Sequence, residues 1–272
     1  MAVRNHQELL APLRETGIRV SLTTRRIGTA IHLFQEVEST NDEAAVLADR
    51  GETEGMIVIA ERQYRGRGRL GRQWESPMGL GLYFSVILRP PIPPQGAPVL
   101  ALMGAVAGAE AIERTTGFTT ALKWPNDLIL HGRKVGGILG EMAAEGSRIL
   151  YVILGIGINV NQTETDFAGE LRQTAGSLRV EAGYPIDRTA VVRSLCERLD
   201  GWYERFLCDG PQPILEQVRR RCLTLGRMVV ARSGDEEVSG FAVELDGKGR
   251  LVIRDARGTL HHLVAGDVTL TG

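Results

Sequence analysis

The segment Gln63–Arg72 has the composition of an anion-binding loop. It carries four arginines within eight residues, Arg65, Arg67, Arg69 and Arg72, interleaved with glycines. Glycines let backbone N–H groups approach an anion, and arginines add fixed positive charge. Because so many like charges repel one another, a bound polyanion would stabilise the loop, and we expect a phosphate site here. The alternative is a solvated Arg-Gly loop or a nonspecific contact with nucleic acid.

The glycines of this loop, Gly66, Gly68 and Gly71, formally match the dinucleotide-binding fingerprint. That motif follows a strand, opens a helix and has an acidic residue about 20 positions later. Here Trp74 and Pro77 lie where the helix should begin. We therefore expect a phosphate loop of another kind.

A second polar cluster is Lys123-Trp124-Pro125-Asn126-Asp127. Pro125 keeps Trp124 extended and interrupts strand pairing, so the turn directs Asn126 and Asp127 sideways. Short polar side chains at a strand end are suited to bind a ligand or accept a proton. The competing interpretation is a hairpin turn with no further role.

Two further segments combine glycines with one polar residue. Lys134 precedes Gly136 and Gly137 where a turn becomes an apolar strand, and a lysine there can act as a movable charge on a phosphate. The run Gly155–Asn159 ends another apolar strand with two glycines and an asparagine. Glycines weaken a strand, which is explained if a ligand or another backbone comes close. The alternatives are an exposed turn lysine and a tight turn with a left-handed asparagine.

Hydrophobic patterning predicts the elements that hold these segments. A short helix is indicated near Leu9–Leu13, and a helix from Ser39 to Gly51 begins with a hydroxyl cap and a carboxylate three residues on. Further helices are expected at Pro98–Arg114, Arg188–Phe206 and Ile214–Cys222. Strands are expected at Phe34–Val37, Met56–Ala60, Leu82–Leu88, Leu122–Trp124, Asp127–Leu130, Val135–Met142 and Ile149–Ile156.

The pattern changes after Leu225 to five short strands separated by turn signals. These strands are expected at Arg227–Arg232, Glu237–Leu245, Leu251–Asp255, Thr259–Leu263 and Val268–Leu270. They predict a small all-β barrel of about 50 residues appended to a larger mixed α/β domain.

Composition excludes several classes of protein. The chain has 272 residues, 43% hydrophobic and 24% charged, and its net charge of −1 gives no global attraction to nucleic acid. No apolar run is expected to approach the roughly 18 residues that span a bilayer, and no signal-type segment begins the chain, so we expect a cytoplasmic protein. The three cysteines and five histidines lack metal-ligand spacing, so any metal should arrive with a phosphate substrate.

The order of these motifs resembles that of the biotin–protein ligases. The succession is Ser39-Thr40-Asn41, the arginine–glycine loop, Lys123–Asp127, Arg133–Glu141 and Gly155–Asn161. The likeness is strong over residues 34–160, and the C-terminal β segment matches in kind and size. It implies an α+β protein with an N-terminal extension at 1–30, a mixed-sheet, class II synthetase-like catalytic domain at 31–223 and an SH3-like β-barrel at 224–272.

The resemblance also implies roles for individual residues. Biotin would contact Ser39, Thr40, Asn41, Gln63, Arg67, Gly68, Arg69, Lys134, Gly136 and Gly137. The nucleotide would contact Arg69, Arg72, Trp74, Asn126, Asp127, Lys134 and Asn159. The catalytic groups would be Arg67, Arg69, Lys134 and Asp127, the last as base for an attacking lysine. One departure is Leu70, where many members carry a further arginine.

In such a ligase, biotin and ATP with Mg²⁺ form biotinyl-5′-AMP, and biotin then passes to a lysine of a biotin carboxyl carrier protein. Lipoate–protein ligases share this fold and chemistry, and the arginine loop together with Lys123–Asp127 favours biotin over lipoate. A biotin-sensing repressor is the third possibility, but its DNA-binding module needs about 60 residues and only about 30 precede Phe34. We expect an enzyme without membrane or specific DNA binding, and homodimer formation stays open.

Overall fold

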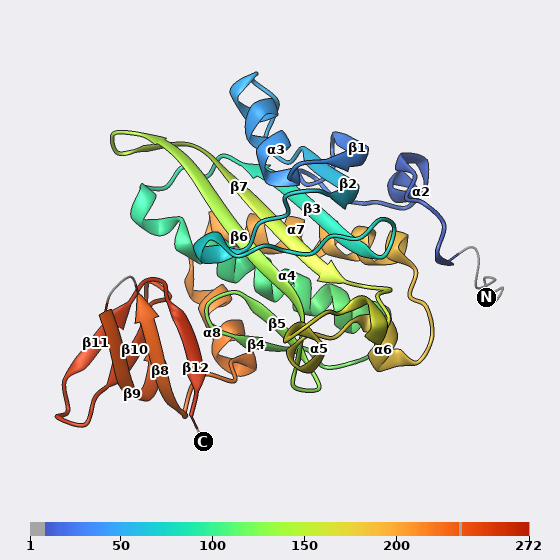
Figure 1. Ribbon diagram of the computed structural model, residues 1–272. Coiled ribbons are helices and arrows are strands. Elements are labelled where there is room, and N and C mark those ends of the chain that lie inside the picture. The colour runs from blue at the N-terminus through green and yellow to red at the C-terminus, as the bar shows by residue number, and fades with distance from the viewer. Residues whose placement is uncertain (1–8, 234–235, 272) are drawn as a thin grey trace.

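The larger part of the molecule is built on one seven-stranded sheet (Figure 1). A computed structural model describes residues 9–233 and 236–271 of the chain. The strands of this sheet are β1 (Ile31–Val37), β2 (Ile57–Gln63), β3 (Gly81–Leu88), β4 (Ala121–Lys123), β5 (Asp127–Leu130), β6 (Arg133–Glu145) and β7 (Arg148–Asn159). They lie in the order β1-β2-β3-β7-β6-β5-β4. β1 and β2 are parallel and the other neighbours antiparallel, so the predicted mixed sheet is confirmed.

Helices cover the two faces of this sheet unequally (Figure 1). On one face α4 (Pro98–Thr116) packs against α7 (Arg188–Asp209) and α8 (Gln212–Arg221), and these elements share the large hydrophobic core with the sheet. On the other face α3 (Thr40–Asp49) lies over β2, β3 and β7 above a smaller apolar cluster. The α3 face is left partly uncovered, and this is where a ligand can reach the strands.

Alternation along β7 decides which residues reach each face. Leu154 and Ile156 belong to the large core, whereas Tyr151 and Ile153 belong to the cluster beneath α3. The next positions on the α3 face fall within Gly155–Asn159. On the α3 face, β7 therefore changes from buried apolar side chains to glycines, which leave space above the sheet.

The start of α3 differs from the expected capping box. Ser39 is the N-cap residue, but its side chain makes no capping hydrogen bond. The Thr40 hydroxyl donates instead to Gln63 Oε1 at 3.0 Å, and the Asp42 carboxylate accepts from Arg67 at 2.5 Å. The capping prediction was wrong because these polar groups bond to other strands and loops, which leaves the helix N-terminus facing the cleft.

The helix α4 is more apolar than the sequence analysis allowed. The segment Pro94–Thr116 is long and apolar enough to cross a membrane by length and composition, so the expectation that no run approaches that length was wrong. Of its most apolar window, 67% is buried inside the protein, where α4 forms the centre of the large core. Such a helix is typical of the core of a globular protein.

The remaining elements of the larger part are short. Of the helix expected near Leu9–Leu13, only Leu9 is helical, Leu10 lies in a turn, and Leu13 lies outside any helix, where its N–H donates to Glu61 Oε1 at 2.6 Å. The short helices that sequence patterning did not indicate are α2 (Glu15–Arg19), η1 (Arg69–Gly71), η2 (Pro94–Gly96), η3 (Glu164–Asp166), α5 (Leu171–Thr174) and α6 (Leu178–Ala182).

The C-terminal segment forms a separate five-stranded antiparallel sheet, as predicted (Figure 1). Its strands are β8 (Met228–Ser233), β9 (Glu236–Leu245), β10 (Leu251–Arg254), β11 (Leu260–Leu263) and β12 (Asp267–Leu270). Their order is β11-β10-β9-β8-β12, and in the described chain no ladder joins β11 to β12. Trp124 Nε1 donates to the Gly249 carbonyl at 3.1 Å, so this sheet is joined directly to the turn before β5.

Candidate active site

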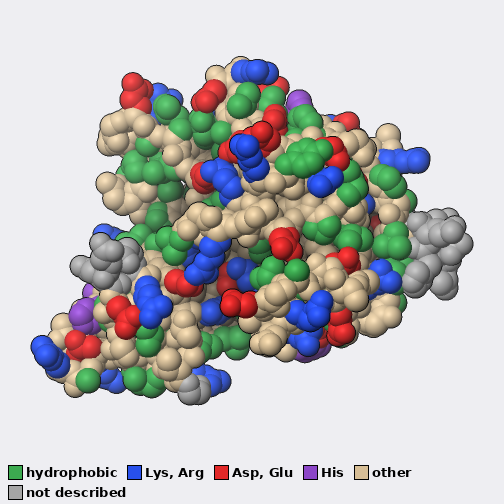
Figure 2. Space-filling view, in the orientation of Figure 1, with side chains coloured by type: hydrophobic (Ala, Val, Ile, Leu, Met, Phe, Trp, Pro, Cys, Tyr) green, Lys and Arg blue, Asp and Glu red, His purple; other side chains and the backbone are tan. Residues whose placement is uncertain are grey.

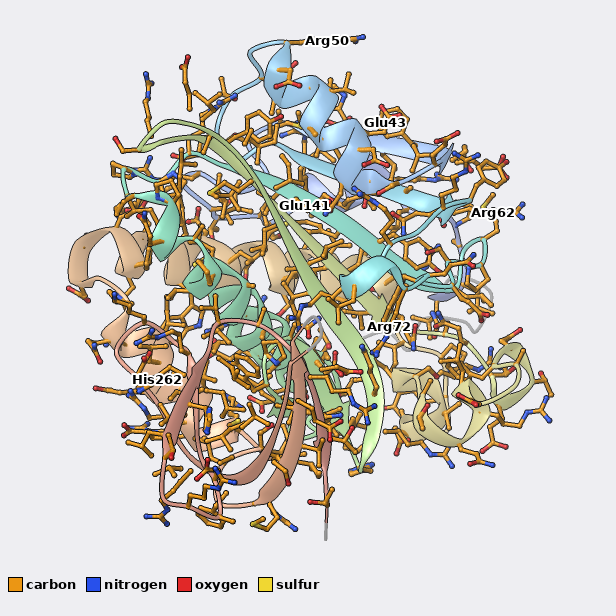
Figure 3. All side chains as sticks on the ribbon, turned by 60° about the vertical axis from the view of Figure 1, so that its left-hand side comes forward. Glu43, Arg50, Arg62, Arg72, Glu141 and His262 are labelled. Carbon is orange, nitrogen blue, oxygen red and sulfur yellow. The ribbon has the colours of Figure 1, made fainter. Side chains whose placement is uncertain are left out.

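A cleft of about 750 Å³ opens on the α3 face of the large sheet. Its walls come from the N-terminus of α3, the arginine loop, the β4–β5 turn, the start of β6, the segment after β7 and β12 of the C-terminal sheet. Figure 2 shows Lys and Arg side chains interspersed with Asp and Glu over this side of the molecule, without one extended basic patch. Figure 3 shows from another side that Arg72 lies where the arginine loop approaches the C-terminal sheet.

The floor of the cleft is made of glycines for a steric reason. A Cβ on Gly155 would lie 2.2 Å from Asn41 Oδ1, and one on Gly157 would lie 2.7 Å from the Trp74 ring. Gly137, the register partner of Gly157, has Trp74 and Lys134 above it. The glycines therefore let these side chains lie directly on the sheet.

Gly136 is not part of this floor. Its register partner is Ile158, a residue of the large core, and a Cβ on Gly136 would lie 2.8 Å from Leu128. Because adjacent residues of a strand point to opposite faces, Gly136 and Gly137 do not both face a ligand on one side of the sheet. The structure thus places Gly136 away from the cleft, which corrects its expected place beside biotin. Every other residue predicted for the site lines the cleft.

One end of the cleft is a buried polar network around Asn41. The Ser85 hydroxyl donates to Asn41 Oδ1 at 2.6 Å, and Asn41 Nδ2 donates to Glu141 Oε2 at 2.6 Å. Gln63 Oε1 accepts from both the amide and the hydroxyl of Thr40. Ser85 and Glu141 were missed by sequence reasoning because they lie inside strands whose patterning indicated only packing. This end offers several donors and acceptors to a neutral polar group.

The arginine loop connects the cleft to the C-terminal sheet. Arg69 donates to Asn126 Oδ1 at 3.1 Å and to the Gly266 carbonyl at 3.3 Å, and Arg72 forms an ion pair with Asp267. Burial lowers the pKa of Arg69, and the Arg72 guanidinium holds the pKa of Asp267 below its usual value. Sequence reasoning could not find Gly266 and Asp267, because nothing local marks a residue that meets a loop so distant in the chain.

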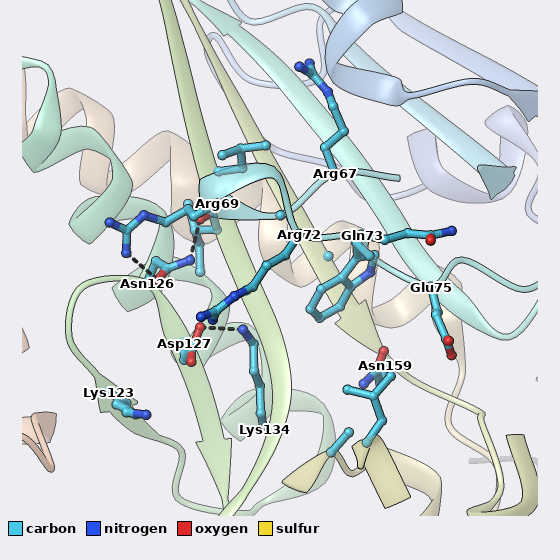
Figure 4. A pocket seen from close by; sticks show the side chains of 18 of the residues that line it. Arg67, Arg69, Arg72, Gln73, Glu75, Lys123, Asn126, Asp127, Lys134 and Asn159 are labelled. Carbon is cyan, nitrogen blue, oxygen red and sulfur yellow. Dashed lines mark hydrogen bonds and ion pairs between the residues drawn. The ribbon is translucent and has the colours of Figure 1, made fainter. Parts of the chain in front are cut away.

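Arg67 lies apart from the other loop arginines. Figure 4 shows its side chain directed away from Arg69 and Arg72. It pairs with Asp42 at 2.5 Å and with Glu141 at 2.8 Å, beside the polar end of the cleft. The loop therefore distributes its charge over two places rather than concentrating it on one anion.

A lysine and a carboxylate face each other in the middle of the cleft (Figure 4). Lys134 Nζ lies 2.6 Å from Asp127 Oδ1 and 5.6 Å from the centre of a Trp74 ring. The cations Arg67, Arg72 and Lys134 thus all have carboxylate partners from the chain itself. An anionic ligand would exchange places with these carboxylates. In the described part of the chain, no group of three or more His, Cys, Asp or Glu side chains could hold a metal ion.

Comparisons with known proteins agree over most of the chain. Residues 33–159 match the biotin/lipoate A/B protein ligase family, and residues 224–270 match the biotin protein ligase C-terminal domain. The bifunctional ligase/repressor BirA of Bacillus subtilis is 38% identical over 258 residues, covering 95% of this chain and 79% of that protein. The biotin–[acetyl-CoA-carboxylase] ligase of Mycobacterium tuberculosis is 31% identical, covering 97% of this chain and 98% of that protein.

Comparison with solved structures indicates the same family. The biotin protein ligase of Aquifex aeolicus, solved in complex with biotin and ATP, matches with a TM-score of 0.76 and 31% identity over 89% of this chain and 99% of that one. The mixed sheet with an appended antiparallel sheet thus has the fold of a biotin protein ligase. The chain belongs to the biotin/lipoate A/B protein ligase family, as an enzyme of the biotin protein ligase type.

Proposed function

We propose that this enzyme activates biotin with ATP to biotinyl-5′-AMP and transfers biotin to one lysine of a biotin carboxyl carrier domain. The observation that carries the proposal is the order of groups along one cleft. A polar end at Asn41, which covers Gly155, is followed by the cation Lys134, which covers Gly137, and by a further polar end at Asn159, and Arg69 lines the same cleft. This order fits an acyl-adenylate, whose charged linkage lies between acyl group and base. Relatives support it, since the matching Aquifex aeolicus ligase was solved with biotin and ATP.

In the first step a biotin carboxylate oxygen bonds to the α-phosphorus, and the bond to the bridging oxygen of pyrophosphate breaks. The barrier comes mainly from repulsion between the carboxylate and the polyphosphate. Lys134 and Arg69 would stabilise the charge, and Arg67 would join them after leaving Asp42 and Glu141. Mg²⁺ would enter bound to ATP, as part of the substrate.

In the second step the acceptor lysine attacks the acyl carbon, and AMP leaves with the electrons of the acyl–phosphate bond. The attacking amine must first lose a proton, because the pKa of a free lysine is about 10.4. We assign Asp127 as the base, since its carboxylate lies in the cleft beside Lys134. When Lys134 turns to the phosphate, Asp127 becomes available to the amine.

We also propose a role for each part of the chain. We assign residues 31–223 to catalysis and 224–272 to closing the cleft through β12, with 1–30 as an extension. The three cysteines are unpaired and fit a reducing cytoplasm. The carrier domain, biotin and ATP are the proposed partners, with no role for DNA or a membrane.

A labelling experiment tests this function. The purified enzyme is incubated with ATP, Mg²⁺ and a biotin carboxyl carrier domain, and radiolabelled biotin or lipoate is offered separately. We expect biotin to label the carrier and a carrier with its target lysine changed to arginine to stay unlabelled. Faster labelling by lipoate, or equal labelling of the altered carrier, would overturn the proposal.

A further inference from the structure

The side-chain amide of Gln162 has a fixed orientation just beyond the end of β7. Asn159 Nδ2 donates to the Gly176 carbonyl at 3.0 Å, so Asn159 Oδ1 is an acceptor. Gln162 Nε2 donates to that oxygen at 3.2 Å. The backbone is held as well, because the Ser177 hydroxyl donates to the Gln162 carbonyl at 2.6 Å. Because Gln162 Nε2 is the donor to Asn159, the other atom of the amide, Gln162 Oε1, is left as an acceptor.

Gln162 Oε1 has no partner among the described residues, although the residue is only 2% exposed. Buried polar atoms of folded proteins are almost always hydrogen-bonded. The neighbouring Asn161 follows that rule, since its amide bonds to both the N–H and the carbonyl of Ile186. Gln162 lines the cleft, so a ligand with an N–H group can supply the missing donor.

Gln162 lies at the end of the cleft opposite Asn41. Asn41 covers Gly155, whereas the hydrogen-bond partner of Gln162 is Asn159, four residues further along β7. At about 3.3 Å per residue, these two positions are about 13 Å apart. Lys134 lies between them, because it covers Gly137, the register partner of Gly157.

We propose that Gln162 Oε1 accepts a hydrogen bond from the 6-amino group of adenine and makes the cleft selective for ATP over GTP. The inference rests on the proposed function. With the acyl group beside Asn41 and the phosphate beside Lys134, the base of an acyl-adenylate extends toward Gln162. Guanine carries a carbonyl oxygen at the same ring position, so two acceptors would face each other with no hydrogen between them.

Comparison of two nucleotides tests this contact. Purine riboside triphosphate carries hydrogen in place of the 6-amino group of ATP. The kcat/KM of biotin-dependent pyrophosphate release is measured with each nucleotide for the wild type and for Gln162→Met, which keeps side-chain length but removes the acceptor. We expect the wild type to favour ATP by about tenfold or more, as loss of one buried hydrogen bond predicts, and Gln162→Met to bring the ratio close to one.

The control is Gln35→Met, at an exposed position of the edge strand β1, which should keep the wild-type ratio. A wild-type ratio near one would overturn the proposal without any variant, so it stays testable even if Gln162→Met folds poorly. A Gln162→Met ratio equal to that of the wild type would also overturn it. Failure of the proposed function itself is a separate outcome, seen as no biotin-dependent pyrophosphate release with ATP.

Discussion

Lys134 and Asp127 form an ion pair of 2.6 Å inside the cleft (Figure 4). The residue proposed to hold the phosphate and the residue proposed to accept the amine proton are therefore partners before any substrate arrives. A phosphate that attracts Lys134 would separate them. The first half-reaction would in this way prepare the carboxylate that the second one needs.

The Asp127→Asn substitution separates the two half-reactions. It keeps the shape of the side chain and removes the base, so transfer from preformed adenylate to the carrier should slow by about 10²–10⁴-fold. Adenylate formation should slow much less. Single-turnover transfer and pyrophosphate release are measured on the same preparation, and equal slowing of both would contradict the role of Asp127 as a base.

The Arg69→Ala substitution should loosen the hold on the adenylate. Arg69 contacts Asn126 and Gly266, so it ties the loop to both walls of the cleft. A charged hydrogen bond stabilises by about 1.5–3 kcal/mol, which predicts release of the intermediate roughly ten to a hundred times faster. The matched control is Arg65→Ala in the same loop, where the arginine is 76% exposed and pairs at 3.6 Å with Glu38. If Arg69→Ala released the adenylate at the wild-type rate, the arginine loop would not be what holds the intermediate.

Local patterning predicted the strands and the arginine loop because each depends on neighbouring residues. It did not predict the pair of Arg72 and Asp267, which joins two sheets and depends on how they pack. The family resemblance placed Gly136 and Gly137 together beside biotin, although the alternation of a strand sends them to opposite faces. Gln162 lies in a segment without helical or strand periodicity, so only the folded chain brings it to the cleft.

The Gly155→Ala substitution should disturb the polar end of the cleft. Its Cβ would lie 2.2 Å from Asn41 Oδ1, so Asn41 must move away from Ser85. Overpacking of this kind costs about 1–3 kcal/mol of folding stability, and biotin should bind more weakly. Isothermal titration with biotin and chemical unfolding measure the two effects.

The matched control is Gly140→Ala on β6, where a Cβ would lie 3.8 Å from Ala101 in ordinary contact. It should keep its biotin affinity. If Gly155→Ala bound biotin as tightly as Gly140→Ala does, the floor beneath Asn41 would not belong to the ligand site.

The C-terminal sheet should lose stability in acid. Burial acts to raise the pKa of Asp246, but hydrogen bonds from the Lys248 and Arg250 amides and the Arg250 side chain outweigh it and lower the pKa below the ordinary 3.8. A carboxyl whose pKa is lower in the folded state stabilises the fold above its unfolded pKa. That contribution is lost as the pH falls below about 4 and through the folded pKa.

Chemical unfolding between pH 7 and pH 3 measures this effect. The Asp246→Asn variant should be less stable than the wild type at neutral pH and should lose less stability on acidification. The control is Asp209→Asn, since that side chain is 56% exposed at the end of α7. If the free energy of unfolding fell equally in the wild type and in Asp246→Asn, Asp246 would not contribute to the loss of stability in acid.

The most direct test is whether the enzyme makes the intermediate without an acceptor. Biotin, ATP and Mg²⁺ are mixed with the protein, and the products are separated and identified by mass spectrometry. We predict that one pyrophosphate is released for each biotinyl-5′-AMP formed. The biotinyl-5′-AMP should stay bound to the enzyme until a carrier domain is added. Absence of the adenylate, or its formation from lipoate and not from biotin, would contradict the account.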